Sequence, residues 1–141
     1  MDQASEQVTK VLSALIETNH EIFKLAKRLS ARQEVVKVAD AFQWSRNHAH
    51  SEFGVGSPYL LDWYVDAELA TGRSLVWILE LTWPDGLWTI ESRVETTGDD
   101  GLQPLQEFPT RTAESVAELI NELQVARTEL ADYYNVYFSS V

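Results

Sequence analysis

The residue types that most often do chemistry in proteins gather at one place in this chain, residues 48–52 with the sequence HAHSE. His48 and His50 would share a face only if the segment were a strand. A transition-metal site also needs a third and a fourth ligand, and only Glu52 is in register to supply one. The glycines, serine and proline that follow are typical of a loop. We therefore expect residues 45–58 to form a mobile loop that binds no metal.

Two other chemical motifs are incomplete. Gly54-Val55-Gly56 is similar to part of a phosphate-binding loop, but it lacks the third glycine and a following lysine. The chain has no cysteine, which excludes disulfides, thiolate metal sites and a cysteine nucleophile. No Ser-His-Asp order or nucleophile elbow is present. We therefore predict no catalytic residue, no metal and no cofactor, and expect a binding protein rather than an enzyme.

The charge of the chain is strongly asymmetric. Residues 1–58 contain seven Lys or Arg and seven Asp or Glu, which cancel. Residues 59–141 contain four arginines and fifteen acids, which account for the whole net charge of −11. Such a surface attracts basic proteins and repels anions. Because nucleic-acid binding depends on Lys and Arg neutralising phosphates, we expect no nucleic-acid partner.

Length and composition indicate one globular domain spanning residues 1–141. A chain of this size buries a core without disulfides, and its hydrophobic content of 45% is that of a folded protein. The N-terminus has no basic start followed by an apolar run, so we expect no secretory signal. Apolar runs fall far short of the ~20 residues that span a bilayer. These observations predict a soluble cytoplasmic protein without a membrane partner.

Helical periodicity dominates the first third of the chain. Apolar residues recur every three or four positions over residues 3–29, with Asp2 or Ser5 as a cap. Ser30 and Gln33 have the spacing of a capping box, which predicts a second helix to Phe42 or one continuous bent helix. The predicted inner face of the first helix consists of Val8, Val11, Leu12, Leu15, Asn19, Ile22, Phe23, Ala26 and Leu29.

The middle of the chain alternates with the period of two that is typical of β-strands. Residues 60–69, 74–83 and 87–96 are predicted as strands of an antiparallel meander over residues 60–97, joined by tight turns. Residues 102–109 contain two prolines and are predicted to be extended, as a short fourth strand at the sheet edge.

A last helix is predicted over residues 112–137, with Thr112 as its cap and Arg127 interrupting its apolar stripe. The predicted fold is α+β: a two-layer sandwich of a three-stranded, or four-stranded, antiparallel sheet packed against N- and C-terminal helices. In this arrangement the helices cover the tryptophan-rich sheet face. We expect Trp63, Trp77, Leu79, Trp88 and Ile90 to be largely buried and to contact Leu12, Leu15, Ile22, Leu119 and Leu123.

The polar face of the meander is the most specific candidate site. Alternation places six acids on it around three apolar or aromatic residues, with Arg93 as the one cation. An apolar centre with a charged rim is the anatomy of a protein-binding patch; the alternative is that another segment covers the centre. The candidate partner-binding residues are Asp62, Tyr64, Asp66, Glu68, Val76, Ile78, Glu80, Glu91 and Glu95.

In architecture and charge alone, the chain resembles two kinds of small acidic bacterial binding proteins. The first is immunity proteins, which neutralise a toxin. The second is secretion-type chaperones with a helix–meander–helix core, which have two further strands before the last helix where this chain offers residues 102–109. We therefore predict a non-enzymatic domain that neutralises or escorts a basic protein partner, such as a toxin. The alternatives are a ligand-binding domain or small enzyme with a pocket between helices and sheet, and a homodimer built on the exposed patch.

Overall fold

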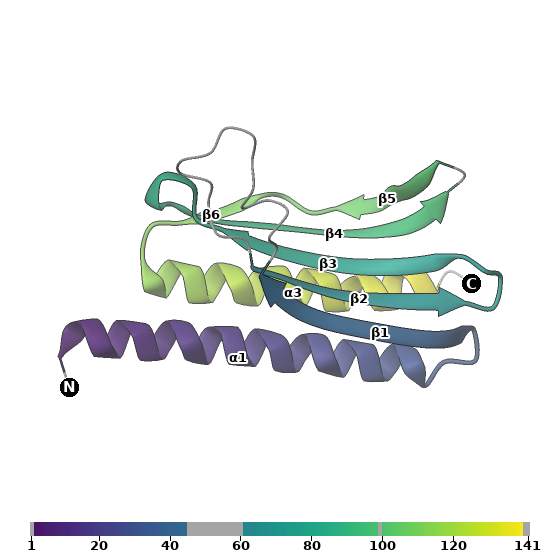
Figure 1. Ribbon diagram of the computed structural model, residues 1–141, viewed down its shortest axis with the longest axis horizontal. Coiled ribbons are helices and arrows are strands. Elements are labelled where there is room, and N and C mark those ends of the chain that lie inside the picture. The colour runs from purple at the N-terminus through teal and green to yellow at the C-terminus, as the bar shows by residue number, and fades with distance from the viewer. Residues whose placement is uncertain (1, 45–60, 99, 140–141) are drawn as a thin grey trace.

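The computed structural model describes residues 2–44, 61–98 and 100–139. Two helices, α1 (Gln3–Ser30) and α3 (Val116–Ser139), lie side by side on one face of an antiparallel sheet (Figure 1). The fold is therefore α+β with N- and C-terminal helices, as predicted. The predicted loop at residues 45–58, with His48, His50 and Glu52, lies outside the described residues.

The sheet has six strands rather than the predicted three or four. The strand order is β1-β2-β3-β4-β5, and β6 pairs with the first residues of β4, ahead of the stretch that pairs with β5. The strands are β1 (Val35–Trp44), β2 (Leu61–Leu69), β3 (Ser74–Thr82), β4 (Trp88–Gly98), β5 (Gly101–Glu107) and β6 (Arg111–Ala113). A short 3-10 turn, η1 (Pro84–Gly86), joins β3 to β4, and Gly86 has a φ of 82° that favours glycine.

The first correction concerns residues 30–42, which do not form a second helix. The chain leaves α1 at Ala31 and pairs antiparallel with β2 from Val35 to Trp44. Val35, Val36 and Val38 are β-branched and fit a pleated strand better than a helix. The local capping signal is therefore outweighed by a full ladder of hydrogen bonds to β2, which would otherwise be the sheet edge.

The second correction concerns the start of the last helix. Residues 102–107 of the predicted extended segment do form an edge strand, β5, while residues 108 and 109 lie beyond its end. Thr112 lies in the unpredicted strand β6 rather than at a helix cap. Ser115 caps α3 instead, because its hydroxyl accepts a hydrogen bond from the Glu118 backbone N–H at 3.1 Å. The β6 pairing fixes Arg111, whose guanidinium binds Glu122 and Glu129 of α3 at 3.1 and 3.0 Å.

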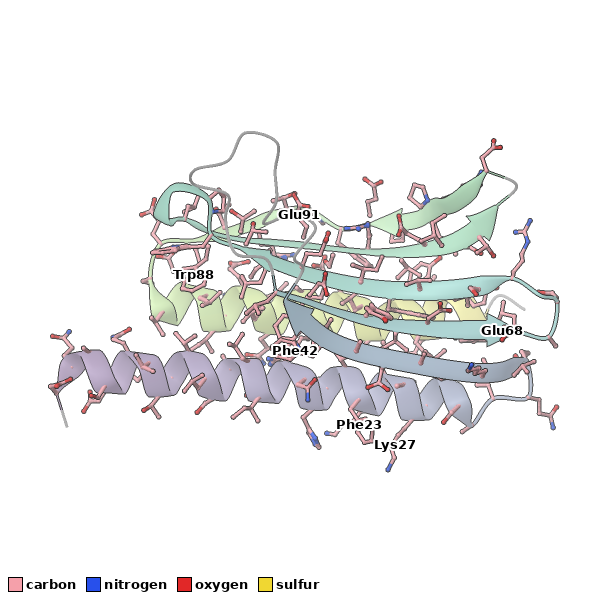
Figure 2. All side chains as sticks on the ribbon, in the orientation of Figure 1. Phe23, Lys27, Phe42, Glu68, Trp88 and Glu91 are labelled. Carbon is pink, nitrogen blue, oxygen red and sulfur yellow. The ribbon has the colours of Figure 1, made fainter. Side chains whose placement is uncertain are left out.

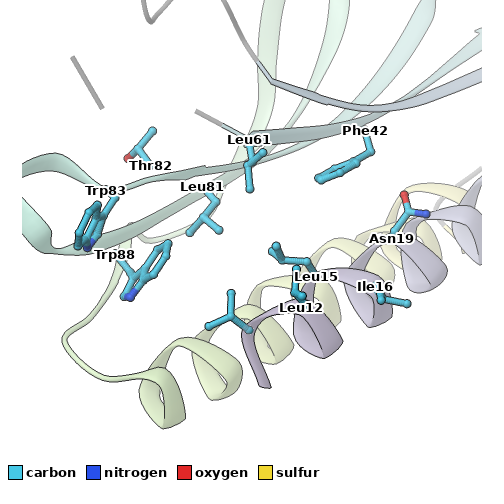
Figure 3. Close-up of a pocket in the computed structure, with 11 residues that line it drawn as sticks. Leu12, Leu15, Ile16, Asn19, Phe42, Leu61, Leu81, Thr82, Trp83 and Trp88 are labelled. Carbon is cyan, nitrogen blue, oxygen red and sulfur yellow. The ribbon is translucent and has the colours of Figure 1, made fainter. Parts of the chain in front are cut away.

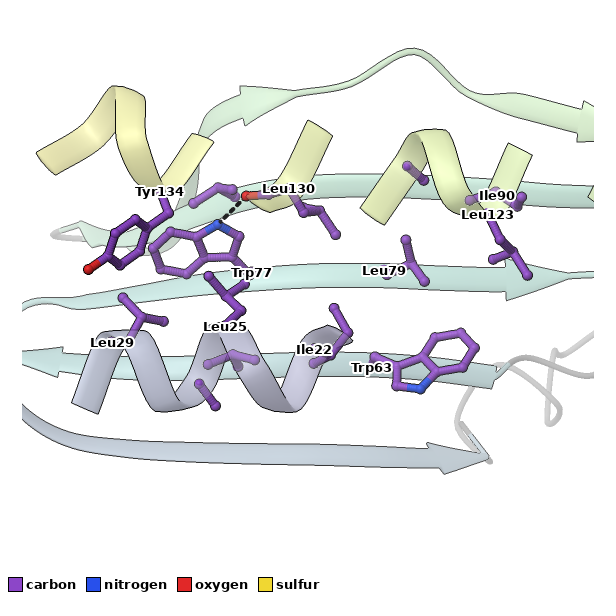
Figure 4. Close-up of a cluster of buried hydrophobic side chains, with 14 of the residues drawn as sticks. Ile22, Leu25, Leu29, Trp63, Trp77, Leu79, Ile90, Leu123, Leu130 and Tyr134 are labelled. Atoms are coloured by element: carbon purple, nitrogen blue, oxygen red, sulfur yellow. Dashed lines mark hydrogen bonds between the residues drawn. The ribbon is translucent and has the colours of Figure 1, made fainter. Parts of the chain in front are cut away.

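The core lies between the helices and the sheet, as predicted. Trp63, Trp77, Leu79 and Ile90 are each at most 1% exposed. The Trp77 indole N–H donates a hydrogen bond to the Leu130 carbonyl of α3 at 3.1 Å, which satisfies its one polar atom in the interior (Figure 4). Trp88 is partly buried and packs against this core instead of lying within it.

The two halves of α1 have different environments. Ile22, Leu25 and Leu29 in the second half are buried under the sheet and α3. The first turns extend past the end of the sheet (Figure 1), and Leu12 is 53% exposed, so it lies outside the buried core. Phe23 is also exposed, on the side of the helix away from the sheet, with the Lys27 ammonium 5.4 Å from its ring centre (Figure 2).

Arg127, the polar member of the apolar stripe of α3, is buried between the two helices. Its guanidinium donates a hydrogen bond to the Thr18 hydroxyl at 2.9 Å and lies 3.6 Å from a Glu17 carboxylate oxygen. Thr18 in turn donates to the Ala14 carbonyl. The buried charge is thus held by polar groups of α1. In the described part of the chain, neither helix has an apolar stretch long enough to cross a bilayer.

Candidate functional site

The strand register brings all nine predicted partner-binding residues onto one face of the sheet, opposite the helices. We call this surface the acidic sheet face. Directly paired across the strands are Asp62 with Glu80, Tyr64 with Ile78, Asp66 with Val76, Val76 with Glu95, and Glu80 with Glu91. Glu68 ends the row on β2, and Figure 2 shows Glu68 and Glu91 toward opposite ends of the strands. The alternation in the sequence was sufficient to find this face. Each of the nine residues is adjacent in the chain to residues whose side chains point into the core, so its own side chain points to the other side of the sheet.

The centre of the acidic sheet face is only partly accessible. Val76 is 7% exposed and lies between its register partners Asp66 and Glu95. Tyr64 and Ile78 are half-buried beside it. The sequence left open whether the centre is exposed or covered. Val76 is buried, while the Tyr64 and Ile78 side chains keep surface that a partner can contact.

Arg93 neutralises part of this face. Its guanidinium contacts a Glu80 carboxylate oxygen and lies 3.5 Å from Glu95, and both acids are less than one-fifth exposed. Burial lowers the pKa of Arg93, but its hydrogen bonds and attraction to the two carboxylates outweigh burial and raise the pKa overall. Asp66, Glu68 and Glu91 make no ion pair with any described residue within 4.0 Å, although Lys37 of β1 lies opposite Glu68 in the register. Asp66 and Glu91 therefore supply most of the unbalanced negative charge.

A second candidate site is a cavity of about 600 Å³ between the first half of α1 and the ends of the strands (Figure 3). We call it the apolar groove. A pocket between helices and sheet is one of the alternatives predicted from the sequence, but no residue that lines one was predicted. The lining side chains are Val11, Leu12, Leu15, Ile16 and Asn19 of α1, Phe42 of β1, Leu61 of β2, Leu81 and Thr82 of β3, Trp83 and Trp88.

Aromatic rings form part of the groove's walls. Trp83 and Trp88 have ring centroids 5.6 Å apart, and Trp83 is 50% exposed. Phe42 stacks against the buried Trp63 at 4.8 Å and leaves 45% of its own surface exposed. Large aromatic surfaces held open to solvent in this way are typical of binding sites.

The described lining of the groove is almost entirely apolar. Among its described lining residues, the side-chain polar groups are the Asn19 amide, the Thr82 hydroxyl and the two indole N–H groups. Acid–base catalysis in a pocket between helices and sheet requires a carboxylate or histidine with a displaced pKa, and this lining contains neither. Within residues 2–44, 61–98 and 100–139, no three His, Cys, Asp or Glu side chains are placed to hold a metal ion.

Two arginines near the C-terminal end of α1, Arg28 and Arg32, contact aromatic rings of α3. The Arg28 guanidinium lies 4.0 Å from the Tyr134 ring centre, and the Arg32 guanidinium lies 3.9 Å from that of Phe138. Arg32 also pairs with Glu34 at 2.8 Å. These cation–π contacts join α1 to the aromatic end of α3, where Tyr134 and Phe138 are buried and Tyr133 and Tyr137 are half-buried.

Comparison with known proteins adds no function to this geometry. No family model, no curated protein and no solved structure matches the chain. The candidate sites therefore depend on the sequence and the structure alone.

Proposed function

We propose that this protein is a non-enzymatic binding domain that takes a basic protein partner on its acidic sheet face. One observation carries the proposal: six carboxylates lie in register on three adjacent strands, and the described cations on this face are Arg93 among them and Lys37 of the neighbouring strand β1, which lies opposite Glu68 in the register. Strands of neutral composition would cover the same core equally well. The concentration of acid on this face is therefore better explained by a partner than by folding.

The charges and the centre of this face have different roles in the proposal. Unpaired carboxylates attract a cationic surface over several ångströms and raise the rate of encounter. Once the partner has docked, Tyr64 and Ile78 supply apolar contact that slows dissociation, because the central residues of an interface carry most of its binding energy.

The test compares two variants that remove the same charge from different places. The first is Asp66→Asn/Glu68→Gln/Glu91→Gln on the acidic sheet face; the ion-paired Glu80 is left intact. The matched control is Asp100→Asn/Glu114→Gln/Asp132→Asn, which removes three exposed acids elsewhere. Wild type and both variants are used to capture partners from the native cell, and the captured proteins are identified by mass spectrometry.

We expect wild type and control to capture the same basic protein and the sheet-face variant to capture much less of it. Tyr64→Ala and Ile78→Ala should instead capture it with faster dissociation. Equal capture by the two charge variants, or a captured partner that is itself acidic, would contradict the proposal.

Neutralising and escorting are the two forms that this function can take. Secretion-type chaperones, which the chain resembles in architecture, have two further strands before the last helix, and β5 and β6 occupy that position. The two forms differ in the state of the partner that is bound. A neutralising protein requires the folded partner and blocks its activity, whereas an escort binds the unfolded partner, so binding measured before and after denaturing the partner separates them.

A further inference from the structure

A row of exposed apolar side chains runs along the first half of α1. Val8, Leu12 and Ile16 are 58%, 53% and 69% exposed. Residues four apart stand above one another on a helix, so the three side chains form a single line. The line borders the apolar groove, because Leu12 and Ile16 are also part of its lining (Figure 3). Row and groove together make one continuous apolar surface.

The charged side chains in the first half of α1 lie on a different side of the helix from this row. With 3.6 residues per turn, each residue is rotated about 100° from the one before it. Glu6, Lys10 and Glu17 therefore fall on the side of the helix roughly opposite Leu12. The polar residues that border the row carry no carboxylate, ammonium or guanidinium group: Thr9, Ser13, Asn19 and His20.

In a chain with a net charge of −11, a surface free of charge is where a second copy can approach at the lowest electrostatic cost. The acidic sheet face, by contrast, would place carboxylates against carboxylates. That repulsion argues against the homodimer on the sheet patch that the sequence left as an alternative.

Val8 and Ile16 are each four residues from Leu12, and this equal spacing fits an interface between two identical copies related by a two-fold axis. A two-fold axis through Leu12 would set two α1 helices antiparallel, with Val8 of each copy against Ile16 of the other. Antiparallel helices also oppose their dipoles favourably. The groove beside the row has Phe42 and Trp83 in its walls. In the dimer these walls would cover one side of the partner copy's α1, which would otherwise face water.

We propose that two copies of this chain associate through Val8, Leu12 and Ile16 and the adjoining apolar groove, with their α1 helices antiparallel. Because α1 and the acidic sheet face are on opposite sides of the sheet, this dimer leaves both acidic faces open. The inference concerns a different surface from the proposed function, so either can fail without the other.

Sedimentation equilibrium over a range of concentrations tests the association. Wild type should reach twice the 16.0 kDa of one chain. Leu12→Asp should raise the dimer dissociation constant by at least about tenfold, because it places a charge at the centre of the interface. Leu102→Asp on β5 is the matched control, since Leu102 is 51% exposed and Leu12 53%. A wild type that stays monomeric at every soluble concentration would overturn the proposal, and so would equal dimerisation of the two variants.

Cysteine cross-linking tests the orientation. The chain has no cysteine of its own, so an introduced thiol is the only one present. Leu12→Cys should form a disulfide-linked dimer on mild oxidation. Val8→Cys mixed with Ile16→Cys should link to each other faster than either links to itself. Faster linkage of each variant to itself would show parallel helices and overturn the antiparallel arrangement, and circular dichroism checks that every variant keeps its helices.

Discussion

The acidic sheet face and the apolar groove are the two candidate surfaces of this molecule, and they differ in charge. The sheet face carries six carboxylates with one arginine among them, while the described lining of the groove carries no charged side chain. On the sheet face, Tyr64 and Ile78 are surrounded by charged side chains. The groove places its aromatic and aliphatic residues beside the uncharged flank of α1.

This difference determines which partners each surface can meet. A charged face selects a partner of opposite charge and repels a second copy of itself. An uncharged apolar surface makes no such selection, and it is open to a second copy of an acidic chain. The predictions below test whether the two surfaces are as distinct as the structure indicates.

The largest expected effect distinguishes the exposed flank of α1 from its core side. Ile22 is 5% exposed and Ile16 is 69% exposed on the same helix. Ile22→Ala should lower the free energy of unfolding by about 2–5 kcal/mol, because it leaves a cavity in the core. Ile16→Ala should change it by less than about 0.5 kcal/mol, as expected of a surface position. Urea unfolding at a low protein concentration measures both, and a large loss for Ile16→Ala would show that this flank is core.

An intermediate effect is expected at Arg93 on the acidic sheet face. Arg93→Gln leaves Glu80 and Glu95 half-buried without their cation and should cost about 1–3 kcal/mol of unfolding free energy. Part of that loss should be recovered in high salt, which screens the repulsion among the remaining carboxylates. Arg73→Gln, in the exposed β2–β3 turn, is the control and should cost little. A loss at Arg93 that salt does not change would argue against a repulsive cluster.

The smallest effect concerns the free end of α1, where Asp2 caps the helix. The Ser5 backbone N–H donates to the Asp2 carboxylate at 2.8 Å, and this hydrogen bonding lowers the pKa of Asp2 below its ordinary value of 3.8. A lowered folded pKa means that the cap stabilises the helix above pH 3.8 and is lost as the pH falls through the folded pKa. The Ser5 amide shift followed by NMR should therefore titrate with a midpoint below 3.8.

Asp2→Asn is the control for this titration, since asparagine caps a helix without titrating. The Ser5 amide shift of this variant should lack the acid transition. A wild-type midpoint at or above 3.8 would show that the cap is not formed in solution.

The acidic sheet face could be predicted from the sequence because it depends on local alternation. Once Trp63 and Trp77 are assigned to the core, Tyr64, Val76 and Ile78 must lie on the other face of their strands. The burial of Val76 at 7% exposure could not be predicted in this way, because it depends on how long the side chains of neighbouring strands are and where they point.

The position and the lining residues of the apolar groove could not be predicted, because they depend on where the sheet ends relative to α1. Periodicity identifies the apolar side of a helix but not the element that covers it, so Leu12 and Ile22 received the same assignment. β1 was missed for a related reason. A capping box at Ser30 is a local signal, and the pairing of residues 35–44 with β2 is a tertiary one that outweighs it. The signal in the sequence for β1 was its run of β-branched residues, Val35, Val36 and Val38.

The most direct test of the central claim is the association rate with the captured basic partner as a function of salt. For wild type and the Asp100/Glu114/Asp132 amide control, the rate should fall steeply as NaCl rises, because salt shortens the range of electrostatic attraction. For the Asp66/Glu68/Glu91 amide variant, the rate should already be low in dilute salt and should change little. The three rates should converge in high salt. Equal rates for the two amide variants in dilute salt would show that the acidic sheet face does not recruit the partner.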